Sequence, residues 1–501
     1  MTSRSFSILV LLTLCIQMAS AQTQLLERVE HQHIISQLKK TSSSDQQVRI
    51  ITNGDRGVAD PTRPELVTLP DGKKKFVAGF SGQQIMMFDS LKDIVHGGIK
   101  PVHSVNLINA FGFPYGNDMD PETGREIGYD FDSSTWDVSL FKFRSPSGET
   151  QLKVLAGAMG DDEAGKPYLS RDGYNNTRQR LFFDAEFKKL PDSNDYQLHA
   201  SNPKAVLNSG KPVDGNWVQT NEQGQVVFNH GYGGEPITFL NGDLYIDERG
   251  FVPFLHEMVV EQRNIADPRA PGGIRRIPYR TAIVLTYLDK TLSKIMVPAK
   301  IILDVYKSDG SIWAAAERPT AGPLIEGPHI EVRFNGRPVE SSAEMKALRL
   351  KKSKIEYQML FSAGEFFGHY GSYMATSSGD LDSFKPVLGE NQELLDITAP
   401  LRVLFTWIGR PVSFHVEGKE YLMLHGVDRL SVPEGIKLDQ IPQHHEWQYF
   451  KRQEIIVPVE RYFEKGVEKL RLKDDSGLIE HLKKFRPRKI SKIQATLIQV
   501  A

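Results

Sequence analysis

Short apolar stretches bounded by turn residues recur along most of this chain, and they constrain its fold more than any other feature. Each has the length of a β-strand, and glycine, aspartate, asparagine or proline stands at or near its end. Helical periodicity is weak except near the C-terminus. The stretches lie at residues 74–82, 83–90, 151–160, 249–260, 280–288, 299–306, 354–364 and 419–427. The pattern predicts an all-β protein.

A coarse repeat underlies these stretches. A turn signal followed by a strand-like run with an aromatic residue returns near Asp71, Ser147, Gly250, Gly336 and Gly418. The spacing is irregular, and polar insertions fill the larger gaps. Repeated β-units that cannot bury a face alone are typical of propeller blades, so the repeat favours a five-bladed β-propeller with insertions. Periodicity alone leaves a β-sandwich or a pair of β-domains as the alternative.

The length and charge of the chain set wider limits. Its 501 residues carry a formal net charge of -1, which gives no electrostatic reason to expect nucleic acid or an anionic membrane as a partner. We expect an N-terminal lead over residues 22–49, the propeller over 50–455 and a C-terminal extension over 456–501. Within that extension, 458–472 and 477–485 are predicted to form short helices.

The first 21 residues have the features of a secretory signal peptide. Arg4 supplies a positive charge, residues 8–16 are apolar, and Ala19-Ser20-Ala21 fits a cleavage site of small residues. Cleavage after Ala21 would make the protein secreted or periplasmic. Leu14 is too large for a lipoprotein cleavage site, so no membrane anchor is expected. The single cysteine, Cys15, lies in the signal peptide, and the mature chain would have no disulfide or thiol nucleophile.

Three acids stand at similar places in successive units. Asp60, Asp137 and Glu326 each precede one of the repeated strands. In a propeller the innermost strands face a central channel, so acids at their starts would converge. Glycoside hydrolysis uses such a set: one carboxyl protonates the leaving oxygen, another activates water, and a third can raise the pKa of the proton donor. Each acid taken alone also fits an ordinary turn residue.

The segment "EGPHIEVRFNG" (326–336), followed by residues 357–384, resembles a known family. It is similar to the proton-donor blade of glycoside hydrolase family 43, the five-bladed β-propeller arabinanases, xylosidases and arabinofuranosidases. "ADPTRPELV" (59–67) resembles the family's opening Asp-Pro blade, and "TWDVSLFKF" (135–143) a shortened form of its Trp-Ala-Pro-Asp-Val segment. Residues 234–257 resemble its third blade. The resemblance spans residues 50 to 430 and marks a divergent member.

The resemblance implies an inverting acid/base mechanism on a poly- or oligosaccharide, with no cofactor. Glu326 would be the general acid, Asp60 the general base, and Asp137 the acid that tunes and orients Glu326. The resemblance and the neighbouring aromatic residues also suggest a set of sugar contacts: Trp136, Glu235, Phe366, Trp407 and Arg410.

One departure from the family concerns Arg410, which follows Gly409 where many members have histidine. A guanidinium cannot ligate calcium, so a calcium ion in the central channel is not expected. Arg410 could instead pair with a central carboxylate or bind an acidic sugar. The histidines lack zinc-site spacing, so no metal site is predicted. Two other functions stay open: a non-catalytic propeller that binds a glycan or a protein, and a relative that transfers sugar to another acceptor or to phosphate.

Overall fold

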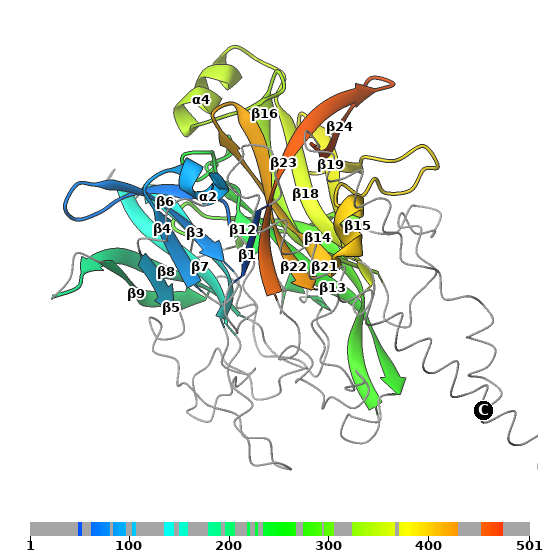
Figure 1. Ribbon diagram of the computed structural model, residues 1–501, viewed down its shortest axis with the longest axis horizontal. Helices are drawn as coiled ribbons and strands as arrows, with labels where there is room; N and C mark the ends of the chain where they lie inside the picture. Colours follow the sequence, from blue (N-terminus) through cyan, green and yellow to red (C-terminus); the bar gives the residue numbers. More distant parts are fainter. Residues whose placement is uncertain are drawn as a thin grey trace, which may run out of the picture.

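Antiparallel β-strands make up most of the described chain in the computed structural model (Figure 1). The structure describes residues 49–52, 62–80, 84–96, 103–106, 135–144, 150–158, 179–191, 196–205, 218–220, 226–228, 234–266, 274–292, 295–304, 323–365, 370–428 and 452–473. The predicted signal peptide, Asp60 and Phe366 lie outside the described residues. So does the predicted N-terminal lead, except for Arg49.

Five antiparallel units follow one another along the chain and form the blades of a five-bladed β-propeller. Blade one contains β2 (Glu65–Thr68), β3 (Lys74–Phe80), β4 (Gln84–Phe88) and β5 (His103–Asn106). Blade two contains β6 (Thr135–Arg144), β7 (Thr150–Ala158), β8 (Gln179–Lys189) and β9 (Tyr196–Ala205). Blade three contains β12 (Gly234–Pro236), β13 (Val252–Ala266), β14 (Ile274–Leu288) and β15 (Ile295–Asp304).

The last two blades share one ten-stranded sheet. Blade four contains β16 (Pro323–Phe334), β17 (Arg337–Pro338), β18 (Glu356–Glu365), β19 (Tyr370–Ser378) and β20 (Lys385–Pro386). Blade five contains β21 (Phe405–Val416), β22 (Lys419–Asp428), β23 (Arg452–Glu464), β24 (Val467–Leu472) and β1 (Arg49–Thr52). A parallel pairing of Tyr370 with Trp407 joins the two.

A few smaller elements complete the described structure. The pair β10 (Val218–Thr220) and β11 (Val226–Phe228) forms a separate small sheet. The helices are α2 (Leu91–His96), α4 (Ser342–Leu350) and the 3-10 helix η3 (Ala399–Val403). In α4 the Ser341 side chain caps the Glu344 amide, and Met345 and Leu348 are buried.

The predicted repeat coincides with the blades. Its turn signals fall between the first and second strands of the five units, near Asp71, Ser147, Gly250, Gly336 and Gly418. The backbone explains the glycines, because Gly250 and Gly418 have φ of 84° and 78°, where other residues are strained. The all-β prediction and the propeller are thus confirmed, and the β-sandwich alternative is wrong.

Apolar cores between neighbouring blades hold the ring together. One core joins Phe141 and Phe182 of blade two to Phe254 of blade three. Larger clusters lie between blades three and four and between blades four and five. A further cluster packs Phe88 of β4 and Ile94 of the following helix α2 against strands of blade five. The first and last blades are therefore in direct contact.

The N-terminal strand completes the last blade. β1 pairs antiparallel with β23, from Arg49 opposite Ile456 to Thr52 opposite Gln453. The sheet of blade five continues through β23 and β24 to Leu472, beyond the predicted start of the C-terminal extension at residue 456. Residues 458–472 form the β23–β24 hairpin rather than a helix (Figure 1). Its two-residue turn at Lys465-Gly466 has φ of 51° and 79°, the sign that a hairpin turn with right-handed strand twist requires.

None of the helices in the described ranges combines the length and apolar character needed to cross a membrane.

Candidate functional site

The first strands of three blades carry the same irregularity near their N-terminal ends. In each, the register with the neighbouring long strand (β7, β18 or β22) shifts so that two residues face one. This is the arrangement of a β-bulge, a feature over-represented beside active sites because it redirects side chains. The bulged pairs are Asp137-Val138 in β6, Gly327-Pro328 in β16 and Arg410-Pro411 in β21. Asp137, Gly327 and Arg410 thus take equivalent backbone positions, and Glu326 comes one residue earlier.

The bulge in β16 begins directly after Glu326, which pairs with Ser362 of β18. Gly327 has φ of 55° and Pro328 lacks an N–H group, so the regular ladder cannot continue through them. The Gly327 amide instead donates to Glu257 Oε1 of β13. Contacts from blade three thus fix the backbone beside Glu326.

Arg410 lies against this bulge. It is 7% exposed, has φ of 53°, and its amide donates to Ser362 Oγ. A Cβ atom added to Gly327 would lie 2.8 Å from Arg410 Cγ and 3.2 Å from its Cα. Only glycine therefore fits between Glu326 and Pro328 without moving the backbone of blade five.

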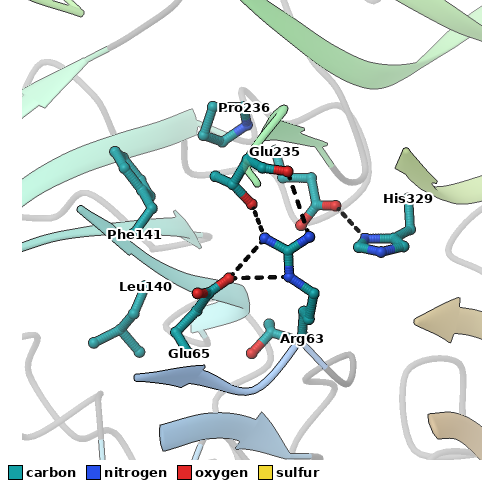
Figure 2. A pocket seen from close by; sticks show the side chains of 9 residues that line it. Arg63, Glu65, Leu140, Phe141, Glu235, Pro236 and His329 are labelled. Carbon is teal, nitrogen blue, oxygen red and sulfur yellow. Dashed lines mark hydrogen bonds and ion pairs between the residues drawn. The ribbon is translucent and has the colours of Figure 1, made fainter. Parts of the chain in front are cut away.

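A small polar pocket lies where the first strands of blades one to four approach one another (Figure 2). Its lining comes from segments far apart in the sequence: Thr62, Arg63, Glu65, Leu140, Phe141, Glu235, Pro236, Thr238 and His329. The convergence confirms that these strands are the innermost ones of the propeller.

Arg63 and Glu65 form a buried ion pair in this pocket. Arg63 Nη2 lies 2.9 Å and Nε 3.1 Å from Glu65 Oε1 (Figure 2). Arg63 also donates to Thr238 Oγ1 and to the Phe239 carbonyl, which ties blade one to blade three. Burial raises the pKa of Glu65 to about 7, although the Arg63 charge opposes this shift. Glu65 Oε2 is buried without a hydrogen-bond partner among the described residues.

Glu235 and His329 form a second polar pair. Glu235 Oε1 lies 2.9 Å from His329 Nδ1, and the His329 side chain is 5% exposed (Figure 2). When His329 is neutral and donates from Nδ1 to the carboxylate, Nε2 is left with a lone pair. Nε2 is buried and has no partner within the described part of the chain. The pocket therefore brings two carboxyl groups and one imidazole together.

The predicted residues divide into two groups. Glu235 lies in the pocket and Arg410 lies against the Glu326 segment, as described above. The backbone positions of Asp137, Trp136, Glu326 and Trp407 are defined on β6, β16 and β21, but their side chains lie outside what the structure describes, as do Asp60 and Phe366 entirely. Convergence of Asp60, Asp137 and Glu326 on one cavity stays a prediction.

The sequence interpretation missed Arg63, Glu65 and His329. A signal for each was present: Arg63 and Glu65 are two apart and so lie on one face of an extended segment, and His329 follows Gly327-Pro328 directly. In the described ranges no three His, Cys, Asp or Glu side chains come together in a way that could hold a metal ion.

Comparison by sequence returns nothing: no family model matches the chain, and no curated protein matches it significantly. Comparison by structure returns solved glycosidases of low sequence identity. A thermostable family-43 glycoside hydrolase is 11% identical with a TM-score of 0.41, and the match covers 84% of this chain and 95% of that one. An α-L-arabinofuranosidase from Lactobacillus brevis is 11% identical with a TM-score of 0.40, covering 83% and 95%. A Cellvibrio cellulosa α-L-arabinanase complexed with arabinohexaose is 11% identical with a TM-score of 0.38, covering 85% and 98%.

Proposed function

We propose that the protein is a glycoside hydrolase that cleaves a poly- or oligosaccharide with inversion at the anomeric carbon. The observation that carries this proposal is the bulge of β16, which holds the Glu326 backbone between Glu257 of blade three and Arg410 of blade five. An acid fixed in this way at the start of an innermost strand is what proton donation to a bound sugar requires. The resemblance of residues 326–336 to a proton-donor blade supports the same role.

In this mechanism Glu326 protonates the leaving oxygen while Asp60 deprotonates the attacking water. Inversion requires room for that water, with the two carboxyl groups about 6.5–9.5 Å apart. Asp137 would raise the pKa of Glu326 through its negative charge and keep it protonated until the leaving oxygen departs. Trp136, Phe366, Trp407 and Glu235 would contact the sugar. We further propose that cleavage after Ala21 exports the protein, which N-terminal sequencing of the mature chain would test.

The test of the mechanism is Glu326→Gln. The variant keeps the shape of the side chain but cannot donate a proton, so hydrolysis of natural glycosides should fall at least ~100-fold. Hydrolysis of an aryl glycoside with an activated leaving group should retain much more of its rate, because that group needs little protonation. The measurement is the release of reducing sugar from arabinan, xylan and acidic glycans, and of nitrophenol from aryl glycosides.

Glu344→Gln serves as the control, since Glu344 lies on α4 outside the pocket and binds Arg337 and the Glu340 amide. Equal activity of Glu326→Gln and wild type on both substrate types would reduce Glu326 to a turn residue. Sugar binding by wild type without hydrolysis of any glycan would instead identify a non-catalytic propeller.

Arg410 bears on the charge of the proposed substrate. Its side chain starts beside Gly327 and carries a permanent positive charge, and so we propose that it favours an acidic sugar. Arg410→Ala should weaken binding of an acidic oligosaccharide ~10-fold and leave a neutral one within about twofold, as a lost charged hydrogen bond would. Calorimetric titration with both ligands makes the comparison. Equal losses would show that the Arg410 charge serves the fold and not recognition.

A further inference from the structure

Thr281 and Glu257 of blade three form hydrogen bonds with the two residues that flank Glu326. Thr281 Oγ1 accepts the Ile325 amide at 2.6 Å and donates to the Ile325 carbonyl at 2.9 Å. Glu257 accepts the amide of Gly327. We propose that Thr281, together with Glu257, is a positioning residue for the proton donor; the inference rests on the function proposed above.

The register of β16 explains why these contacts matter. The backbone of Glu326 pairs with Ser362 of β18. Because the backbone N–H and C=O groups of successive residues point to opposite sides of a strand, those of Ile325 and the N–H of Gly327 point away from β18. On that side β16 pairs with the two-residue strand β17, at Arg333 and Phe334, and within the described residues no strand pairs there with Ile325 or Gly327. The outward groups of Ile325 and Gly327 would be buried without partners unless side chains from another blade supplied them.

Blade three supplies those partners from one face of its sheet. Glu257 of β13 is paired with Ile283 of β14, and Thr281 lies two residues from Ile283 on the same side. Both side chains are buried, at 0% and 1% exposure. The peptide around Glu326 is therefore bound on one edge by β18 and on the other by Thr281 and Glu257, which leaves the Glu326 backbone little freedom of position.

Thr286 offers a matched control for removal of the Thr281 hydroxyl. Thr286 lies on the same strand as Thr281, is 0% exposed, and also donates to a backbone carbonyl at 2.9 Å. Its acceptor is the carbonyl of Val297 in β15, so this hydrogen bond stays within blade three and does not reach β16. Thr281→Val and Thr286→Val thus delete the same group at equal burial, and they differ in whether the Glu326 segment loses a contact.

The experiment measures both the segment and the reaction. Hydrogen exchange of the peptide covering 323–334, followed by mass spectrometry, should accelerate ~10-fold in Thr281→Val and stay at the wild-type rate in Thr286→Val. On the oligosaccharide that wild type cleaves, Thr281→Val should lower kcat ~10- to 100-fold with KM within about twofold, because a small misplacement of the acid costs rate and not binding. An activated aryl glycoside should lose less than ~3-fold.

Thr281→Ser keeps the hydroxyl and should restore kcat to within about threefold of wild type. Should Thr281→Val fail to fold, Thr281→Ala places no methyl group against Ile325 and takes its place in every measurement. An active wild type whose Thr281→Val variant matches Thr286→Val in exchange and kinetics overturns the positioning role alone. A wild type that cleaves no glycan overturns the proposed function itself.

Discussion

Glu65 shows what a single buried acid does to this fold. Burial raises its pKa from 4.5 to about 7, so the folded protein holds this proton more tightly than the unfolded chain. Stability from Glu65 is therefore full below pH 4.5 and is lost as the pH rises toward 7. Glu65→Gln mimics the protonated acid and removes this dependence. Between pH 4.5 and 8, wild type should lose on the order of 3 kcal/mol relative to the variant.

Urea unfolding of both proteins at several pH values measures this difference. The Arg63 guanidinium is the main opposing influence, because it stabilises the carboxylate form through two hydrogen bonds to Oε1. If the variant becomes more stable than wild type as the pH rises, burial outweighs the Arg63 charge in setting the pKa of Glu65. Parallel stability curves for the two proteins would mean that Arg63 cancels the burial cost.

At the scale of the element, the bulge of β16 requires glycine at position 327. Gly327→Ala combines a positive φ with a Cβ that would overlap Arg410 Cγ, so it should cost about 2–4 kcal/mol of unfolding free energy. Gly336→Ala also replaces a glycine of positive φ, but its Cβ meets open space, and its cost should be about 1 kcal/mol. Chemical denaturation compares the two, and equal costs would contradict a packing role for Arg410.

The strands also show how much of the fold can be predicted from the sequence. The strands and the five turns follow from local patterns, because turn glycines and alternating apolar residues act within a few positions. The Arg63–Glu65 pair and its contacts to Thr238 join segments about 175 residues apart, and no local pattern encodes that contact. The helix predicted over residues 458–472 is wrong, because these residues form most of the β23–β24 hairpin, with positive φ at Lys465 and Gly466 in its turn.

At the scale of the whole molecule, the ring is closed by the pairing of β1 with β23. The four residues of β1 pair with residues 453–456 of β23. This stretch includes Ile455 and Ile456, which are buried in the clusters that join blade five to its two neighbours. Without β1 this stretch of β23 becomes a sheet edge, and unpaired edges invite association with other chains. Deletion of residues 22–52 should therefore both destabilise the protein and promote self-association.

The size of the effect follows from the ladder that is lost. A few backbone hydrogen bonds at about 0.5–1.5 kcal/mol each amount to a loss on the order of 3 kcal/mol. Deletion of residues 22–46 is the matched control, because it removes most of the same segment and leaves β1 in place. Guanidinium unfolding should separate the two deletions, and sedimentation should show larger species for the longer one alone. If both deletions unfold at the wild-type midpoint, contacts between blades one and five close the ring by themselves.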